Sequence, residues 1–187
     1  MASDLTFTVH ISNTVSAASR LVGWTLRTFR RRSRQVMLTI WKSLIQSKLD
    51  YTSQLWSPVD QRSISDIEGI QRHFTAQIDG MSGLDYWQRL SSLSLYSQER
   101  RRERYQIIFL WKVAQGLVKG YNATFTQNDR RGRLMVLAPL CNRAPAAVRK
   151  AREASLQVRG AKLFNCLPRG IRDIVTGTPE NFKISLD

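Results

Sequence analysis

The sequence predicts a mainly α-helical fold: an antiparallel bundle of about five helices, followed by an irregular basic C-terminal segment in which short strands can form. Up to about residue 120, apolar residues recur at steps of three and four. Short turn signals separate these segments, which favours antiparallel neighbours. Beyond Gly120, asparagine, glycine and proline interrupt the pattern. We therefore predict a helical module over 1–120 and a basic, loop-rich extension over 121–187.

The first two predicted helices cover residues 10–29 and 34–51. The first has one apolar stripe, made of Ile11, Val15, Ala18, Val22, Leu26 and Phe29. The second, for which Ser33 is a candidate cap, has a broader apolar face made of Val36, Met37, Ile40, Trp41, Leu44, Ile45 and Leu49. A short arginine-rich turn joins the two, so we expect them to lie antiparallel.

Pro58 ends this pattern, and Ser63 or Ser65 is the expected cap of a third helix that stops at Gly80. Its apolar stripe comprises Ile64, Ile67, Ile70, Phe74 and Ile78. A short fourth helix begins at Asp85, because Gln88 three residues later completes a capping-box pattern.

The longest predicted helix runs from about Ser97 to Gly120. Its buried face comprises Ile107, Leu110, Trp111, Ala114, Leu117 and Val118. In the extension that follows, the segment over 133–140, "RLMVLAPL", is the one expected to form a strand.

The charge of the chain points to a polyanionic partner. Lys and Arg total 29 against 14 for Asp and Glu, a net charge of +15. Arginine is far more frequent than lysine, and a planar guanidinium binds phosphate bidentately and stacks on bases. No long apolar span or lysine-rich amphipathic anchor stands out, so we expect RNA and DNA as partners rather than a membrane.

Residues for catalysis are few. His10 and His73 are the two histidines, and Cys141 and Cys166 the two cysteines, without zinc-site spacing, so we expect free thiols in a reducing compartment and no secretion. No two acidic residues adjoin, as two-metal phosphoryl transfer would favour, and no G-x-S-x-G, H-E-x-x-H or P-loop motif occurs. We expect no catalysis from this chain alone, no metal site and no cofactor.

The stretch "QERRRERY" over 98–105 places four arginines directly before an apolar run. On a helix, Arg100 and Arg104 lie about 40° apart and Arg100 lies nearly in line with Trp111, so the buried stripe is expected to turn basic at its start. One interpretation is a phosphate-binding groove; the alternative is a solvated, salt-bridged helix start. The candidate nucleic-acid-binding residues are Arg30, Arg31, Arg32, Arg34, Arg100, Arg101, Arg102, Arg104, Lys112, Arg130, Arg131 and Arg133.

Five tryptophans are interleaved with the basic clusters and could stack on bases: Trp24, Trp41, Trp56, Trp87 and Trp111. Most of them sit at core spacing, and for Trp41 and Trp111 core packing is the favoured interpretation.

Several segments, in order, resemble the region that follows the catalytic palm in reverse transcriptases of non-LTR (LINE-type, jockey-like) retrotransposons. They are "MLTIWKSLIQSKLDYTSQLWSP", "IEGIQRHFT", "GLDYWQRLSSLSLYSQERRRERYQIIFLWKV", "RRGR" and "VRGAKLFNCLPRGIRD". The resemblance covers nearly the whole chain and implies a thumb-like module of an RNA-directed DNA polymerase that grips the template-primer backbone.

The same resemblance implies the partners: RNA and DNA as template-primer, and the missing palm and fingers. The family's Y-x-D-D aspartates, which hold Mg²⁺, have no counterpart in this sequence. It also implies a nuclear location, otherwise a cytoplasmic one. Two alternatives stay open: a non-enzymatic helical module that binds a protein through an uncovered apolar face over Val36–Leu49, and a truncated element copy without function.

Overall fold

The computed structural model describes residues 7–121, 124–128, 130–137, 145–173 and 177–186, with the backbone alone for 124–128. It is mainly helical, as predicted, and divides into two compact units, Met1–Arg102 and Glu103–Asp187. This boundary differs from the predicted one near residue 120. The later part of the predicted long helix shares a core with the C-terminal segment, where the Trp111 ring stacks on Phe182 with 4.7 Å between the ring centroids.

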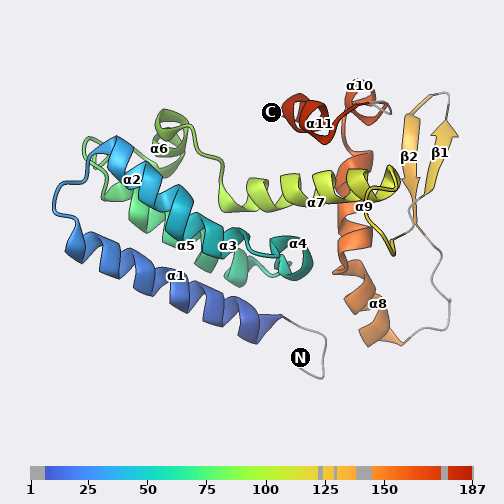
Figure 1. Cartoon of the computed structure of the whole chain (residues 1–187). Coiled ribbons are helices and arrows are strands. Elements are labelled where there is room, and N and C mark those ends of the chain that lie inside the picture. Colours follow the sequence, from blue (N-terminus) through green and yellow to red (C-terminus); the bar gives the residue numbers. More distant parts are fainter. Residues whose placement is uncertain (1–6, 122–123, 129, 138–144, 174–176, 187) are drawn as a thin grey trace. The chain divides into compact units, whose positions relative to one another are not determined.

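The first unit is a bundle of helices (Figure 1). Its elements are α1 (Thr8–Thr28), α2 (Arg34–Ile40), the π-helical turn η1 (Trp41–Ile45), α3 (Gln46–Asp50), α4 (Ser53–Trp56), α5 (Gln61–Ala76), α6 (Tyr86–Leu93) and the start of α7 (Gln98–Ala114). The elements α2, η1 and α3 form one continuous helix that lies antiparallel to α1, as predicted. The short helix α4 was not predicted.

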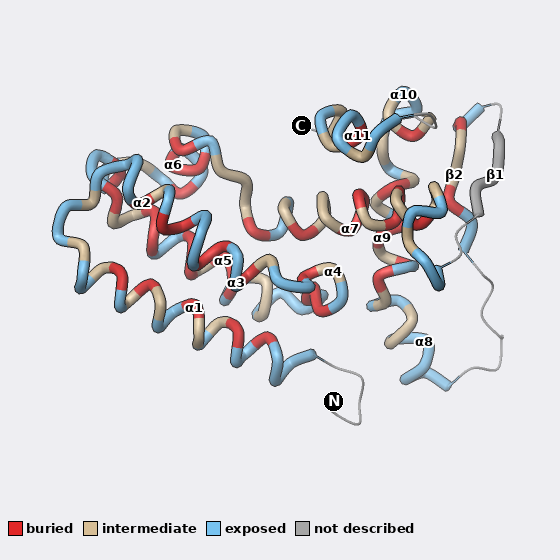
Figure 2. Tube along the Cα trace, in the orientation of Figure 1, coloured by how far each residue is buried: buried red, intermediate tan, exposed pale blue. Residues whose placement is uncertain are grey.

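The core of the first unit lies where α1, the continuous helix and α5 meet. The rings of Trp41 and Phe74 pack with their centroids 5.1 Å apart. Around them lie buried side chains that follow the predicted stripes, including Ile11, Ala18, Val22, Met37, Ile45, Leu49, Ile67 and Ile70. Figure 2 shows the resulting alternation of buried and exposed residues along α1.

The helix caps were predicted in part. The Asp85 carboxylate accepts from the Trp87 and Gln88 N–H groups at 2.8 and 2.9 Å, which confirms the capping box. The cap of α5 is Asp60 rather than Ser63 or Ser65, because the helix already begins at Gln61. Asp60 accepts from the Ser63 N–H at 2.8 Å, and this bond lowers the pKa of Asp60.

Helix α7 is shorter than predicted and ends at Ala114. Gly116 has a φ of +70°, a left-handed conformation that glycine adopts readily and that ends a helix. Leu117, predicted to be buried, is therefore 57% exposed. At 17 residues α7 is also shorter than α1, which has 21.

The second unit contains the rest of α7, an antiparallel hairpin and helices where loops were expected. Its elements are β1 (Thr124–Asn128), β2 (Gly132–Val136), α8 (Ala146–Glu153), α9 (Leu156–Asn165), α10 (Arg169–Arg172) and α11 (Pro179–Ser185). The strand predicted over 133–140 corresponds to β2, while residues 138–140 lie outside the described residues.

Side chains from α9 and the end of α10 bind β2. Asn165 accepts from the Met135 N–H at 2.8 Å and donates to the Met135 carbonyl at 3.2 Å. Asp173 accepts from the Arg133 N–H at 3.0 Å, and this bond, followed by the Arg169 side chain, lowers the pKa of Asp173. The hairpin is thereby attached to the helices of its own unit.

Candidate nucleic-acid interface

The arginine-rich start of α7 is held by an acid from another helix. Glu68 of α5 is 7% exposed, and its carboxylate accepts from the N–H groups of Gln98 and Glu99 at 3.0 and 3.3 Å. The Tyr86 hydroxyl also donates to it. Helix N-termini favour negative charge, so Glu68 adds from α5 a second carboxylate to that of Glu99 in the first turn of α7.

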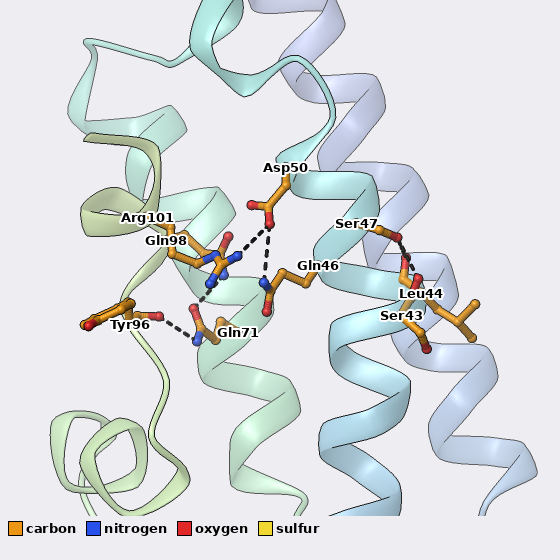
Figure 3. Close-up of polar contacts among 9 residues, drawn as sticks. All are labelled: Ser43, Leu44, Gln46, Ser47, Asp50, Gln71, Tyr96, Gln98 and Arg101. Carbon is orange, nitrogen blue, oxygen red and sulfur yellow. Dashed lines mark hydrogen bonds and ion pairs between the residues drawn. The ribbon is translucent and has the colours of Figure 1, made fainter. Parts of the chain in front are cut away.

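Further polar contacts fix the same helix start (Figure 3). Gln98 donates to Gln71 at 2.8 Å, and Gln71 donates to the Tyr96 carbonyl at 3.1 Å. Asp50, at the end of α3, accepts from Arg101 at 2.9 Å and from Gln46 at 3.3 Å. Three helices of the first unit therefore meet at this turn through side-chain hydrogen bonds.

The four arginines that are grouped in the sequence, Arg100, Arg101, Arg102 and Arg104, have different environments in the structure. Arg101 is half-buried in its ion pair with Asp50, and Arg102 is buried, at 3% exposed. Arg104 belongs to the second unit, where it donates to the Lys183 carbonyl at 2.9 Å. Arg100 is exposed, with its guanidinium carbon 4.9 Å from the centre of the Tyr96 ring.

The first turns of α7 bury a different face from the one that contains Arg100 and Arg104. In its first turns α7 buries Gln98, Arg102 and Gln106, which recur every four residues. All three are polar, so a search for apolar periodicity cannot detect this face.

The turn between α1 and α2 contains the second predicted cluster, and here the arginines differ again. Arg32 donates to Gln77 at 2.6 Å and to the Leu26 carbonyl at 3.3 Å, while Arg34 donates to the Ser92 carbonyl. Arg30 and Arg31 are exposed, and neither makes a hydrogen bond or ion pair within the described part of the chain. Two of the four thus hold the turn, and two are available to a ligand.

The outer face of α1 adds two basic residues that the sequence analysis missed. Arg20 and Arg27 are exposed on α1, just before the arginine turn. The signal that could have found them is the distribution of acids: no Asp or Glu occurs between Asp4 and Asp50. We call Arg20, Arg27, Arg30 and Arg31 the α1 basic surface.

The structure does not bring the two clusters of the first unit together. The arginine turn precedes α2, whereas Arg101 binds Asp50 at the far end of α3. Along the continuous helix between them, Arg34 and Asp50 are roughly 24 Å apart. They are therefore two separate places on the unit.

In the second unit, the remaining predicted residues are spread over the hairpin and α7. Arg130 and Arg131 are exposed at the turn of the hairpin, and Arg133 is half-buried on β2. Lys112 is half-buried on α7. Its charge is a minor contribution to the lowered pKa of Glu180, after the Glu180 N–H and the side chain of Lys183.

The five tryptophans fall into two groups. Trp41 and Trp111 are 0% and 1% exposed, which confirms their core assignment, and Trp56 is 2% exposed. Trp24 and Trp87 are 48% and 65% exposed. Only this second pair is accessible to a ligand.

The apolar face over Val36–Leu49 is not left uncovered, as the protein-binding alternative requires. Its members Met37, Ile40, Trp41, Ile45 and Leu49 are buried within the first unit, and only Val36 and Leu44 are exposed, each at 43%. The α1 and α5 helices cover this face, so no absent domain is needed to do so.

No helix within the described residues is long and apolar enough to cross a membrane. Within the same ranges, no three His, Cys, Asp or Glu side chains lie close enough to hold a metal ion together.

Comparison with protein-family models, with curated proteins and with solved structures found no match to this chain.

Proposed function

We propose that this chain binds nucleic acid through the phosphate backbone and that the α1 basic surface is its principal contact. The observation that carries the proposal is the exposure of four arginines along α1 and the following turn, in a stretch without any acidic residue. An arginine that contacts phosphate releases condensed counterions, which favours binding at low salt and is independent of base sequence.

The surface suits a phosphate ligand better than the start of α7 does. There, Arg101 is neutralised by Asp50 and Arg102 is buried, so only Arg100 of the first unit's predicted α7 arginines is well exposed. Removing a buried or paired guanidinium from its contacts would oppose binding. Arg20, Arg27, Arg30 and Arg31 have no such contacts to lose among the described residues.

The resemblance to non-LTR retrotransposon reverse transcriptases supports a more specific version of the proposal. In it, the chain is a thumb-like module, the ligand is an RNA/DNA template-primer, and the module acts in the nucleus beside a palm and fingers. Any polymerase activity would require the palm, whose aspartates would hold Mg²⁺; this chain would contribute grip on the backbone.

The test is a salt titration of binding to a labelled RNA/DNA hybrid by fluorescence anisotropy. The full chain is compared with a variant in which the α1 basic surface is neutralised: Arg20→Gln, Arg27→Gln, Arg30→Gln and Arg31→Gln. A plot of log affinity against log salt should become shallower by about three to four, since each phosphate contact contributes roughly 0.7 to 0.9 to the slope.

A control variant removes the same charge elsewhere, from four other exposed basic residues: Arg62→Gln, Lys119→Gln, Arg149→Gln and Lys150→Gln. It should keep a slope close to that of the unmodified chain. Equal losses in both variants would mean that net charge, and not the α1 basic surface, governs binding. Absence of binding by the folded, unmodified chain at low salt would refute the proposal itself.

A protein partner is the second candidate, and one observation favours it. Tyr51, Leu55 and Val59 are 72%, 55% and 63% exposed within one short stretch around α4. An apolar interface of this kind would depend little on salt, in contrast to phosphate binding.

A further inference from the structure

Trp24 lies on the side of α1 that faces away from the core. The buried residues of α1 are Ile11, Thr14, Ala18, Val22 and Thr25. At about 100° per residue, Trp24 points roughly 120° away from the centre of this buried stripe, and Arg20 and Arg27 point nearly opposite to it. Trp24 is 48% exposed, so its side chain is only partly packed against the bundle.

Arg20 and Arg27 lie on the same outer face, one on each side of Trp24. They are four residues before it and three residues after it, the spacings that align side chains along a helix. The two arginines are about 10 Å apart along the helix axis. Neither side chain makes a hydrogen bond or ion pair within the described residues.

The indole makes one aromatic contact within the described part of the chain. The Phe29 ring meets it edge to face, with 6.5 Å between centroids and 84° between planes. This contact braces one side of the ring system while close to half of the side chain stays exposed.

The other exposed tryptophan differs in its surroundings. Trp87 is 65% exposed, but it lies beside the acidic Asp85, whose carboxylate accepts from the Trp87 N–H at 2.8 Å, and its ring packs against Tyr86 at 5.1 Å. A polyanion is repelled by such a neighbour. Exposed single aromatic residues are common, so the arginines on both sides and the absence of acids from residues 5–49 of the sequence distinguish Trp24.

We propose that Trp24 stacks on an unpaired base of single-stranded nucleic acid while Arg20 and Arg27 bind the phosphates on either side of it. This inference rests on the proposed function and specifies the form of ligand that this part of the α1 basic surface takes. Bases within a duplex are stacked on one another, whereas an unpaired base presents its face to an aromatic side chain. RNA and DNA offer the same base face and phosphates, so the contact is common to both.

The experiment measures the affinity of the full chain for single-stranded oligo(U), oligo(dT), an abasic strand of equal length and an RNA/DNA hybrid. Trp24→Leu removes the aromatic face and keeps an apolar side chain with good helix propensity. Trp24→Tyr keeps an aromatic face, and Trp87→Leu is the matched control at the other exposed tryptophan. Thermal unfolding of each variant shows that the fold is retained.

Trp24→Leu should weaken binding to oligo(U) and oligo(dT) by roughly tenfold, while binding to the abasic strand and the hybrid changes less than twofold. Trp24→Tyr should recover most of the loss, and Trp87→Leu should have little effect. Oligo(U) and oligo(dT) responding alike would support recognition of the base face, and a loss on only one of them would show that the sugar contributes.

Unchanged binding of both single strands by a folded Trp24→Leu variant would overturn the stacking proposal. If the variant with the neutralised α1 basic surface still bound more weakly, phosphate binding would stand without it. Absence of binding to every strand by the unmodified chain would instead refute the proposed function, and the stacking proposal with it.

Discussion

The arginines of α1 and its following turn contrast with those at the start of α7. Arg20, Arg27, Arg30 and Arg31 are exposed in a stretch without acids. At the start of α7, by contrast, the protein itself makes contacts with the arginine cluster. Glu68 accepts from the N–H groups of the helix terminus, Asp50 forms an ion pair with Arg101, and Arg102 is buried.

This difference shows that density of arginine in the sequence does not measure availability to a ligand. The denser run lies in "RRRER", and the structure uses most of it internally. The acids that decide this are distant in sequence: Asp50 lies 51 residues before Arg101, and Glu68 lies 30 residues before Gln98. Availability therefore depends on tertiary contacts as well as on local charge.

The largest effect should come from Glu68→Gln. It replaces a buried carboxylate that binds two helix N–H groups and a tyrosine hydroxyl, so we expect the free energy of unfolding to fall by about 2–3 kcal/mol. Urea denaturation measures it. Asp66→Asn, an exposed site on the same helix, should change the free energy of unfolding by less than about 0.5 kcal/mol. Equal losses in the two variants would show that Glu68 does not stabilise the start of α7.

Arg102→Gln compared with Arg31→Gln tests the contrast between the clusters directly. Arg102 is buried, so truncation should lower the free energy of unfolding by about 2 kcal/mol through the lost packing of its long side chain. Arg31 is exposed, and its replacement should stay within about 0.5 kcal/mol. Two similar values from thermal or urea unfolding would contradict the assignment of separate roles.

A double-mutant cycle on Asp50 and Arg101 should give a smaller effect. With Asp50→Asn, Arg101→Gln and the double variant, we expect a coupling free energy of about 1 kcal/mol, because both side chains are only partly exposed. The nucleic-acid affinity of Arg101→Gln, measured on the same hybrid, should remain close to that of the unmodified chain. A marked loss of affinity without loss of stability would instead place Arg101 at the interface.

The smallest effect concerns Tyr86 and appears only in alkali. Burial, followed by the hydrogen bond to Glu68, raises the pKa of Tyr86 above its usual value of 10.0. The folded state therefore favours the protonated phenol, so its contribution to stability is complete below pH 10 and is lost as pH rises above it. Tyr86→Phe should flatten the fall in unfolding free energy above about pH 10; identical alkaline profiles for the two proteins would contradict this.

The helical architecture was predictable, because apolar residues at steps of three and four mark the buried faces around Ile11, Trp41 and Phe74. The Asp85 capping box was also readable from local sequence. The polar face of α7 was not, since Gln98, Arg102 and Gln106 are buried although they are polar, and apolar periodicity does not mark such residues.

The boundary between the two compact units has no local signal in the sequence, for a related reason. Trp111 packs on Phe182 across 70 residues of sequence, and no local pattern indicates such a pairing. In the candidate site, charge clusters identified Arg30 and Arg31. Arg20 and Arg27 are isolated basic residues in the sequence, and they join this surface because α1 extends as one helix up to the turn.

The outer edge of β2 also bears on self-association. A short hairpin presents unpaired N–H and C=O groups on which a strand from another molecule can add. In this protein Asn165 occupies both main-chain groups of Met135, and Asp173 occupies the N–H of Arg133. Arg133 and Met135 are the β2 residues whose main-chain groups point away from β1, so the side chains of Asp173 and Asn165 occupy the positions where a third strand would bind to this edge of β2. This edge is thereby protected from edge-to-edge aggregation.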